Sequence, residues 1–160
     1  MREISLTNSD KVAIVDNGDY EEVSKHRWWL RYDEYVLSSS RINGKHQYLH
    51  RFILHPPSGT GIDHVNHNPL DNRRENLRFA TQSQNMANGL RHQDGTSRFK
   101  GVCWNKEMKS WRAKIVYRGI HIHLGNFTSE TSAAIAYDLA ALKYFREFSK
   151  LNFPERITIE

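Results

Sequence analysis

The 160-residue sequence contains a single cysteine, Cys103, and no long apolar run. One thiol cannot form an internal disulfide or supply a zinc site that needs two or more thiolates, so no structural zinc is expected. A membrane-spanning helix needs about 20 consecutive apolar residues, and no stretch approaches that length. The start, MREISLTNSDK, lacks the apolar segment of a secretory signal. We therefore expect a soluble cytoplasmic protein without a membrane partner.

The positive charge is concentrated in one part of the chain. The net charge is +5, and residues 98–127 carry seven basic residues against one acidic residue. Residues 1–60 and 61–97 are each neutral, and residues 128–160 have one acidic residue in excess. A surface that binds phosphates concentrates positive charge in this way, which favours double-stranded DNA as the partner.

The basic segment contains three runs that alternate apolar and polar residues, as half-buried strands do: SRFKGVCWN, SWRAKIVYR and GIHIHLGNF. A two-residue turn at 118–119 predicts an apolar face with three cross-strand pairs: Tyr117 with Ile120, Ile115 with Ile122, and Ala113 with Leu124. The opposite face collects Arg112, Lys114, Val116, His121 and His123. One face of this sheet is thus expected to be core and the other basic.

The segment that follows, TSETSAAIAYDLAALKYFREF, has small apolar residues at helical spacing. Thr128 or Ser129 can cap its start. The expected fold is α+β, with a three-stranded antiparallel sheet packed on one helix. Its basic face could enter a major groove, with arginines reaching guanine edges and lysines reaching phosphates. A solvated face on an ordinary α+β module is the alternative.

Over residues 97–155 the runs FKGVCWN, SWRAKI, HLGNF, SAAIAYDLAALK and LNFPE resemble the plant ethylene-response-factor, or APETALA-type, DNA-binding domain. The resemblance implies that bases are read from the sheet. Carried over by position, the DNA-facing residues would be Lys100, Cys103, Trp104, Arg112, Lys114 and Arg118. Cys103 stands where plant members commonly have arginine, so the target sequence is not carried over. His121 and His123 are expected to contact DNA, with metal binding or solvation as alternatives.

Residues 48–88 are rich in histidine, asparagine and aspartate and contain no cysteine. Carboxylate and amide oxygens suit Mg²⁺ or Mn²⁺, and a neutral imidazole can take a proton from water at neutral pH. We expect a short strand over 61–64, a second strand in NLRFAT, and then a helix that carries Asn85 and Asn88. An asparagine one turn into that helix could reach back over the first strand, so Asp63 and Asn85 could hold one cation.

The string DHVNHNPLDNRRENLRFAT, preceded by LHR, resembles the HNH nuclease family, and most of all the phage and intron-borne homing endonucleases with a ββα-metal finger. This resemblance covers residues 48–88. It implies that His64 is the general base and that Asp63 and Asn85 bind one Mg²⁺ or Mn²⁺. It also implies that Asn76 orients or supports the base, with a supporting role for His50 in the site or on the DNA.

Other roles stay open for several of these residues. His64 could be a hydrogen-bonded structural histidine, Asn76 could cap or turn the chain, and Asn88 could replace Asn85 as the ligand. The loop residues His67 and Asn72 could contact water or phosphate, or simply build the loop. Three arginines could grip phosphates near the cut or be solvated: Arg73, Arg74 and Arg78.

The amino-terminal region, residues 1–47, is expected to be a β-rich platform for the nuclease motif. Its short strands extend into HQYLHRFIL, with a break at 16–18 and a hairpin at Asn43-Gly44. Trp28 and Trp29 are adjacent, so one should face inward and the other outward. A polar linker over 89–97 is expected to precede the DNA-binding domain, residues 98–160.

Together these patterns predict a site-preferring DNA endonuclease of the HNH homing type, which hydrolyses a phosphodiester with one divalent cation. It would act as a monomer or homodimer in a bacterial or phage-infected cell. One alternative is a sequence-specific DNA-binding regulator with an inactive nuclease motif. A third possibility is an RNA-directed or structure-selective nuclease.

Overall fold

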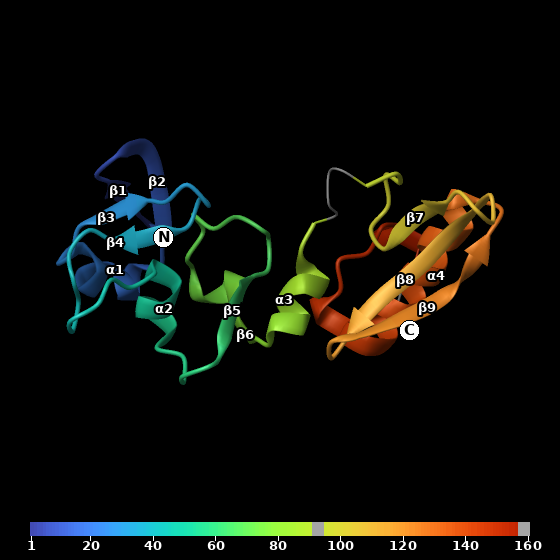
Figure 1. The fold of residues 1–160 in the computed structure, drawn as a ribbon. Helices are drawn as coiled ribbons and strands as arrows, with labels where there is room; N and C mark the ends of the chain where they lie inside the picture. Colours follow the sequence, from blue (N-terminus) through green and yellow to red (C-terminus); the bar gives the residue numbers. More distant parts are fainter. Residues whose placement is uncertain (91–94, 157–160) are drawn as a thin grey trace. The chain divides into compact units, whose positions relative to one another are not determined.

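The computed structural model describes residues 1–90 and 95–156, and the chain divides into two compact units, Met1–Thr81 and Gln82–Glu160 (Figure 1). The linker expected over 89–97 lies partly outside the described residues, which omit 91–94. Within the two described ranges, every helix is too short or too polar to cross a membrane.

The first unit consists of a four-stranded sheet, two helices and a hairpin. The sheet has the order β2-β1-β3-β4, built from β1 (Arg2–Leu6), β2 (Ser9–Val15), β3 (Trp28–Leu30) and β4 (Val36–Ser38). The helices are α1 (Asn17–Ser24) and α2 (Leu49–Leu54). The hairpin pairs β5 (Gly61–His64) with β6 (Leu77–Ala80), and a 3₁₀ turn at Arg74–Asn76 precedes β6.

One hydrophobic core joins the sheet to the hairpin. Trp28 is fully buried and its indole nitrogen donates to the Val23 carbonyl at 2.9 Å. Trp29 is 36% exposed, so the expected alternation of these two tryptophans is confirmed. Ile62 of β5 and Leu77 of β6 belong to the same buried cluster as Trp28. The amino-terminal platform therefore supports the hairpin through a shared core.

One amino-terminal expectation is wrong. The run HQYLHRFIL does not continue as a strand, because Leu49–Leu54 form α2. A short apolar run does not distinguish a strand from a buried helix; the helix ends at His55, which has φ of 47° and stands before two prolines. The strand break expected at 16–18 is confirmed, because β2 ends at Val15 and α1 begins at Asn17, with Asp16 at its N-cap.

The hairpin expected at Asn43-Gly44 is confirmed. Ile42 and Lys45 exchange two backbone hydrogen bonds, and Asn43 and Gly44 both have positive φ, 51° and 82°. Two positive φ values are typical of a type I′ turn, which Asn-Gly favours.

The second unit has the expected α+β form. It contains α3 (Gln82–Asn88), β7 (Val102–Asn105), β8 (Ser110–Tyr117), β9 (Ile120–Phe127) and α4 (Glu130–Phe145), followed by 3₁₀ turns at Arg146–Phe148 and Pro154–Arg156. The sheet is antiparallel with the order β7-β8-β9, and α4 lies along one face (Figure 1). The Ser129 hydroxyl caps α4 by accepting from the Ser132 amide.

The pairing of β8 with β9 is the expected one near the turn, and its register then shifts. Tyr117 faces Ile120 and Ile115 faces Ile122, as expected. Ala113, however, pairs with Gly125 and not with Leu124, because the register shifts between Ala113 and Lys114. A β-bulge adds one residue to a strand, and the φ of +131° at Gly125 is one that other residues rarely adopt.

Gly101, which immediately precedes β7, lies close to Tyr137 of α4. Its φ is +75°, and a Cβ atom built there would lie 1.9 Å from Cδ2 of Tyr137. Tyr137 is itself buried in the core between α4 and the sheet. Only a residue without a side chain fits between these two elements.

We expect Gly101→Ala to destabilise the second unit by about 3 kcal/mol, through overpacking against Tyr137 added to the cost of a positive φ. Gly119→Ala is the matched control, because Gly119 has a similar φ of +78° but nothing within 4 Å. It should cost only about 1 kcal/mol. Urea unfolding followed through NMR signals of β8 measures both, and equal losses would refute the packing argument.

Candidate active site

Asp63 and His64 end the strand β5 and are both buried, with 7% and 4% of their surfaces exposed. Asp63 stands directly opposite Arg78 of β6. The Arg78 guanidinium donates to Oδ2 of Asp63 from Nε at 2.9 Å and contacts the same oxygen through Nη2 at 2.7 Å. The carboxylate that the motif assigns to a metal is thus held in place by a cross-strand arginine.

The His64 ring lies in a pocket made by residues from several elements. Its ring centroid is 5.3 Å from that of His50 and 5.7 Å from that of Tyr35, both edge to face. Burial lowers the pKa of His64, while a polar interaction with the Asn72 side chain and the nearby charge of Asp63 oppose that shift. Because burial dominates, His64 is neutral at neutral pH, which is the form that can accept a proton.

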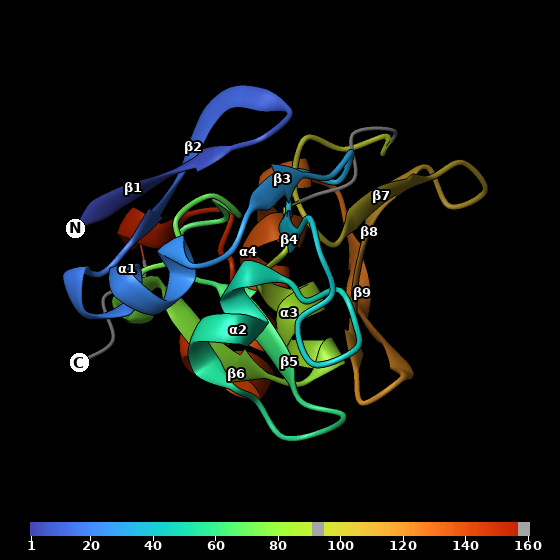
Figure 2. The same cartoon turned by 90° about the vertical axis from the view of Figure 1, so that its left-hand side faces the viewer.

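His50 lies on α2, which packs beside the β5–β6 hairpin (Figure 2). Its ring stacks on Tyr48 with centroids 5.4 Å apart. Burial, then the neighbouring His64 and Arg51, lower the pKa of His50 to about 3. His50 is therefore brought against the expected base, as a neutral neighbour.

Asn76 joins the two sides of the loop between β5 and β6. Its Oδ1 accepts from the Asn66 amide at 2.9 Å, and its Nδ2 donates to the Asp71 carbonyl at 2.7 Å. Asn66 also donates from Nδ2 to the Asp71 carboxylate. Asn76 thus fixes the loop that follows His64.

The sequence gives no indication of Tyr35 as a residue of the site, and it leaves the role of Asn72 open. Asn72 is fully buried, donates from its backbone to Ile14 of β2 and from Nδ2 to the Pro69 carbonyl at 3.0 Å. Asn72 therefore has the loop role that was one of its two alternatives, and it also interacts with the His64 ring. Tyr35 lies in the β3–β4 connection, where nothing in the sequence signals a contact with His64.

The three arginines of the motif region form ion pairs with carboxylates. Besides the Arg78 pair, Arg73 makes a bidentate contact with Asp71 at 2.8 and 2.7 Å and also contacts Glu75. This pairing lowers the pKa of Asp71. Arg74 makes a bidentate contact with Asp19 of α1 at 2.8 and 2.7 Å. Each guanidinium thus has a structural task within the first unit.

Asn85 lies on α3 and so belongs to the second unit, whereas Asp63 belongs to the first. Its side-chain oxygen is buried, and so is the alternative ligand Asn88, at 6% exposure. Within the described part of the chain, no three His, Cys, Asp or Glu side chains gather closely enough to hold a metal ion. A cation bound by Asp63 would therefore need further oxygen ligands from amides, water or phosphate.

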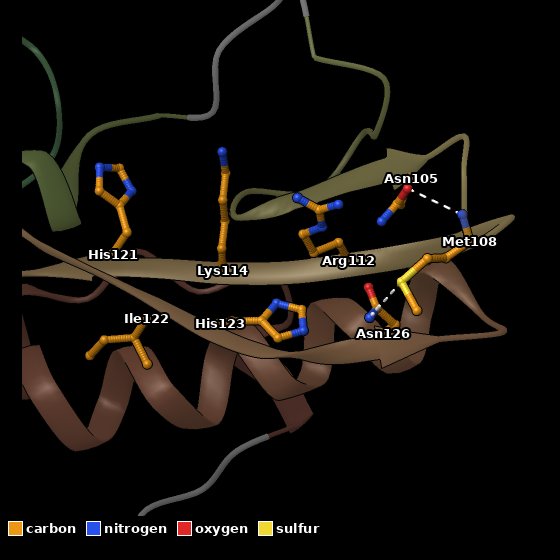
Figure 3. Close-up of a pocket in the computed structure, with 8 residues that line it drawn as sticks. All are labelled: Asn105, Met108, Arg112, Lys114, His121, Ile122, His123 and Asn126. Atoms are coloured by element: carbon orange, nitrogen blue, oxygen red, sulfur yellow. Dashed lines mark hydrogen bonds between the residues drawn. The ribbon is translucent and has the colours of Figure 1, made fainter.

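The basic face lies on β8 and β9, on the side of the sheet away from α4 (Figure 3). We define it as Arg112, Lys114, His121 and His123, which line a shallow hollow of about 360 Å³. Cys103 of β7 pairs with Arg112 and shares this face. Arg118 stands at the β8–β9 turn with its guanidinium 5.2 Å from the centre of the Tyr117 ring.

Two residues expected on this face lie elsewhere. Trp104 packs against Trp111 with ring centroids 5.0 Å apart and alternates with Cys103, so it lies on the α4 side of the sheet. The Lys100 ammonium is part-buried and donates to backbone carbonyls of Met86, Ala87 and Gly89. Side chains alternate along β7, which explains the position of Trp104. The carbonyls at the C-terminal end of α3 need hydrogen-bond donors, which explains the position of Lys100.

Comparison with known proteins identifies the family of the chain. The model of the HNH endonuclease family matches residues 55–87. An uncharacterized HNH endonuclease of Acanthamoeba polyphaga mimivirus is 36% identical over 146 residues, which are 88% of this chain and 74% of that protein. The chain therefore belongs to the HNH endonuclease family.

Two further relatives correspond to parts of the chain. Protein 3.8 of Escherichia phage T7 is 38% identical over 39% of this chain and 52% of its own length. An AP2-like ethylene-responsive transcription factor of Arabidopsis thaliana is 37% identical over 46% of this chain, and the match spans only 21% of that protein. No solved structure matches.

The His50 pKa leads to a pH prediction. The folded protein keeps His50 neutral down to about pH 3, whereas an unfolded chain protonates it near 6.5. The unfolded state therefore binds the extra proton, and stability falls as the pH decreases from 6.5, by up to about 1.4 kcal/mol per pH unit. An NMR titration should show constant His50 ring shifts from pH 8 to 4. His50→Phe assigns the signal, and a midpoint near 6.5 would contradict the prediction.

Proposed function

We propose that this chain is a site-preferring DNA endonuclease of the homing type, which hydrolyses one phosphodiester with a single divalent cation and uses His64 as the general base. The observation that carries the proposal is the neutral, buried His64 beside Asp63 at the end of β5. A general base and an anionic metal ligand on adjacent residues can act on the same phosphate group.

The pocket of His64 suits a general base. The imidazole is neutral at neutral pH, so one ring nitrogen can accept the proton of an attacking water. Asn72 interacts with the ring, and the edges of His50 and Tyr35 restrict its rotation. We assign His50 a supporting role through this packing and Asn76 a supporting role through the loop.

The oxygen donors of the chain fit Mg²⁺ or Mn²⁺ better than zinc. Mg²⁺ is commonly bound by one or two protein carboxylates together with waters and substrate phosphates, and the Asp63 carboxylate and the Asn85 amide both offer oxygen donors. Zinc prefers nitrogen and sulfur ligands. When bound, the cation would stabilise charge on the phosphate and on the leaving 3′ oxygen. Arg78 holds the Asp63 carboxylate in position.

The second unit supplies the DNA contacts in this proposal. The basic face is accessible in a shallow hollow, and the similarity to AP2-like transcription factors supports DNA as its ligand. Arg112 would read guanine edges and Lys114 would contact phosphate, with Cys103 and Arg118 beside them. A monomer with one nuclease motif would nick one DNA strand, and a homodimer could cut both DNA strands.

We expect His64→Ala to lower the rate of DNA cleavage with Mg²⁺ or Mn²⁺ by about 10²- to 10⁴-fold, the usual contribution of a general base. His46→Ala is the control, because His46 contacts the Ser38 carbonyl outside the His64 pocket. Cleavage assays on a randomised DNA library would reveal any site preference. Equal cutting by His64→Ala and wild type would reject the assigned base.

The alternative function gives a different result in the same experiment. A DNA-binding regulator with an inactive nuclease motif would bind one DNA site tightly without metal and would nick no substrate. Competition with RNA and with branched DNA distinguishes the third possibility, a nuclease with another substrate preference.

We expect Lys114→Met to weaken DNA binding and to reduce the slope of log K against log salt by about one, because one phosphate contact is lost. Lys143→Met removes the same charge from α4, on the other side of the sheet, and should leave the slope unchanged. Fluorescence anisotropy at several salt concentrations measures both slopes. Equal slopes for the two variants would exclude the basic face as the phosphate contact.

A further inference from the structure

The helix α3 carries the expected metal ligand Asn85 and is packed into the core of the DNA-binding domain. Ala87 is 5% exposed and belongs to a buried cluster with Ile115 of β8 and Tyr137 of α4. The backbone amide of Lys150 donates to the Ala87 carbonyl at 3.2 Å. By its contacts, this last element of the nuclease motif is a part of the second unit.

Lys100 strengthens this attachment at the C-terminal end of α3. Its Nζ lies 3.0 Å from the Met86 carbonyl and also bonds the carbonyls of Ala87 and Gly89. An ammonium has three N–H donors, and three carbonyls account for all of them. The last carbonyls of a helix lack intrahelical partners and carry partial negative charge, which a cation stabilises.

The backbone of Lys100 is fixed as well. Its amide donates to Oδ1 of Asn152 at 2.8 Å, and Nδ2 of Asn152 donates to the Lys100 carbonyl at 3.2 Å. Asn152 in turn donates to the fully buried Asp138 of α4 from its amide and from Nδ2, at 2.9 and 3.0 Å. A continuous set of hydrogen bonds therefore runs from α4 through Lys100 to α3.

We propose that Lys100 is a positioning residue that fixes α3, and with it Asn85, to the domain that carries the basic face. The inference rests on the proposed function, in which Asn85 is a metal ligand. Its consequence is that Asn85 keeps a fixed position relative to the basic face, because both belong to the second unit. The basic face and the position of Asn85 are then linked through one part-buried lysine.

This assignment differs from the role that the plant domains imply for the same position. There the residue would face DNA and its loss would weaken binding. Here the ammonium donors are engaged by α3, so its loss should leave affinity for DNA intact and impair the placement of Asn85. The two roles predict opposite outcomes in one experiment.

The test uses full-length Lys100→Met, with Lys114→Met as the comparison. For Lys100→Met we expect a DNA dissociation constant within about twofold of wild type in EDTA. We also expect amide hydrogen exchange in α3 to be at least about tenfold faster, and the Mg²⁺ concentration for half-maximal single-turnover cleavage to rise about tenfold. Lys100→Gln keeps two donors and should fall between Lys100→Met and wild type, which guards against a variant that does not fold.

Two results would overturn the inference. One is a loss of DNA affinity as large as that of Lys114→Met with unchanged exchange in α3, which would place Lys100 on DNA. The other is faster exchange in α3 with wild-type Mg²⁺ dependence, which would reduce Lys100 to a purely structural role. If wild type cuts no DNA, the proposed function fails, and the exchange measurement alone still reports whether Lys100 fixes α3.

Discussion

The first unit depends on keeping two neighbouring imidazoles away from water. His50 and His64 meet edge to face, and burial lowers the pKa of each ring. Burial disfavours a charge on either ring, and His64 and Arg51 lower the pKa of His50 further, so both rings are neutral at neutral pH. Tyr35, from the connection between β3 and β4, closes another side of the pocket. The amino-terminal platform is therefore part of the structure that keeps the His64 ring buried and neutral.

The charged residues of the two units have different tasks. In the first unit Arg74 and Arg78 meet the carboxylates of Asp19 and Asp63, which fixes the hairpin to α1 and holds the expected metal ligand. In the second unit Arg112 and Lys114 line an open hollow. The arginines of the hairpin are thus engaged in ion pairs within the first unit, whereas the basic side chains of the second unit line the surface of the sheet. The neutral and basic segments of the sequence correspond to this division.

Local patterns predicted the elements whose structure depends on local contacts. The strand over 61–64, the Asn43-Gly44 turn and the pairing next to 118–119 follow from alternation and turn chemistry. The bulge before Gly125 did not follow from alternation, because it accommodates one extra residue within the sheet. The sequence also predicted a strand where the six-residue helix α2 lies, since an apolar run that short is compatible with a strand or a helix.

The sequence by itself determined the chemistry: an Asp-His pair, an asparagine-rich loop and a basic strand pair, because each is a matter of residue type and short spacing. Only the tertiary structure decided which partner each charged or polar group would have. Lys100 bonds to α3, and Asn72 is held by β2. Such partners are set by packing between segments that are distant in sequence, since a buried polar group must bond to whatever the fold brings within reach.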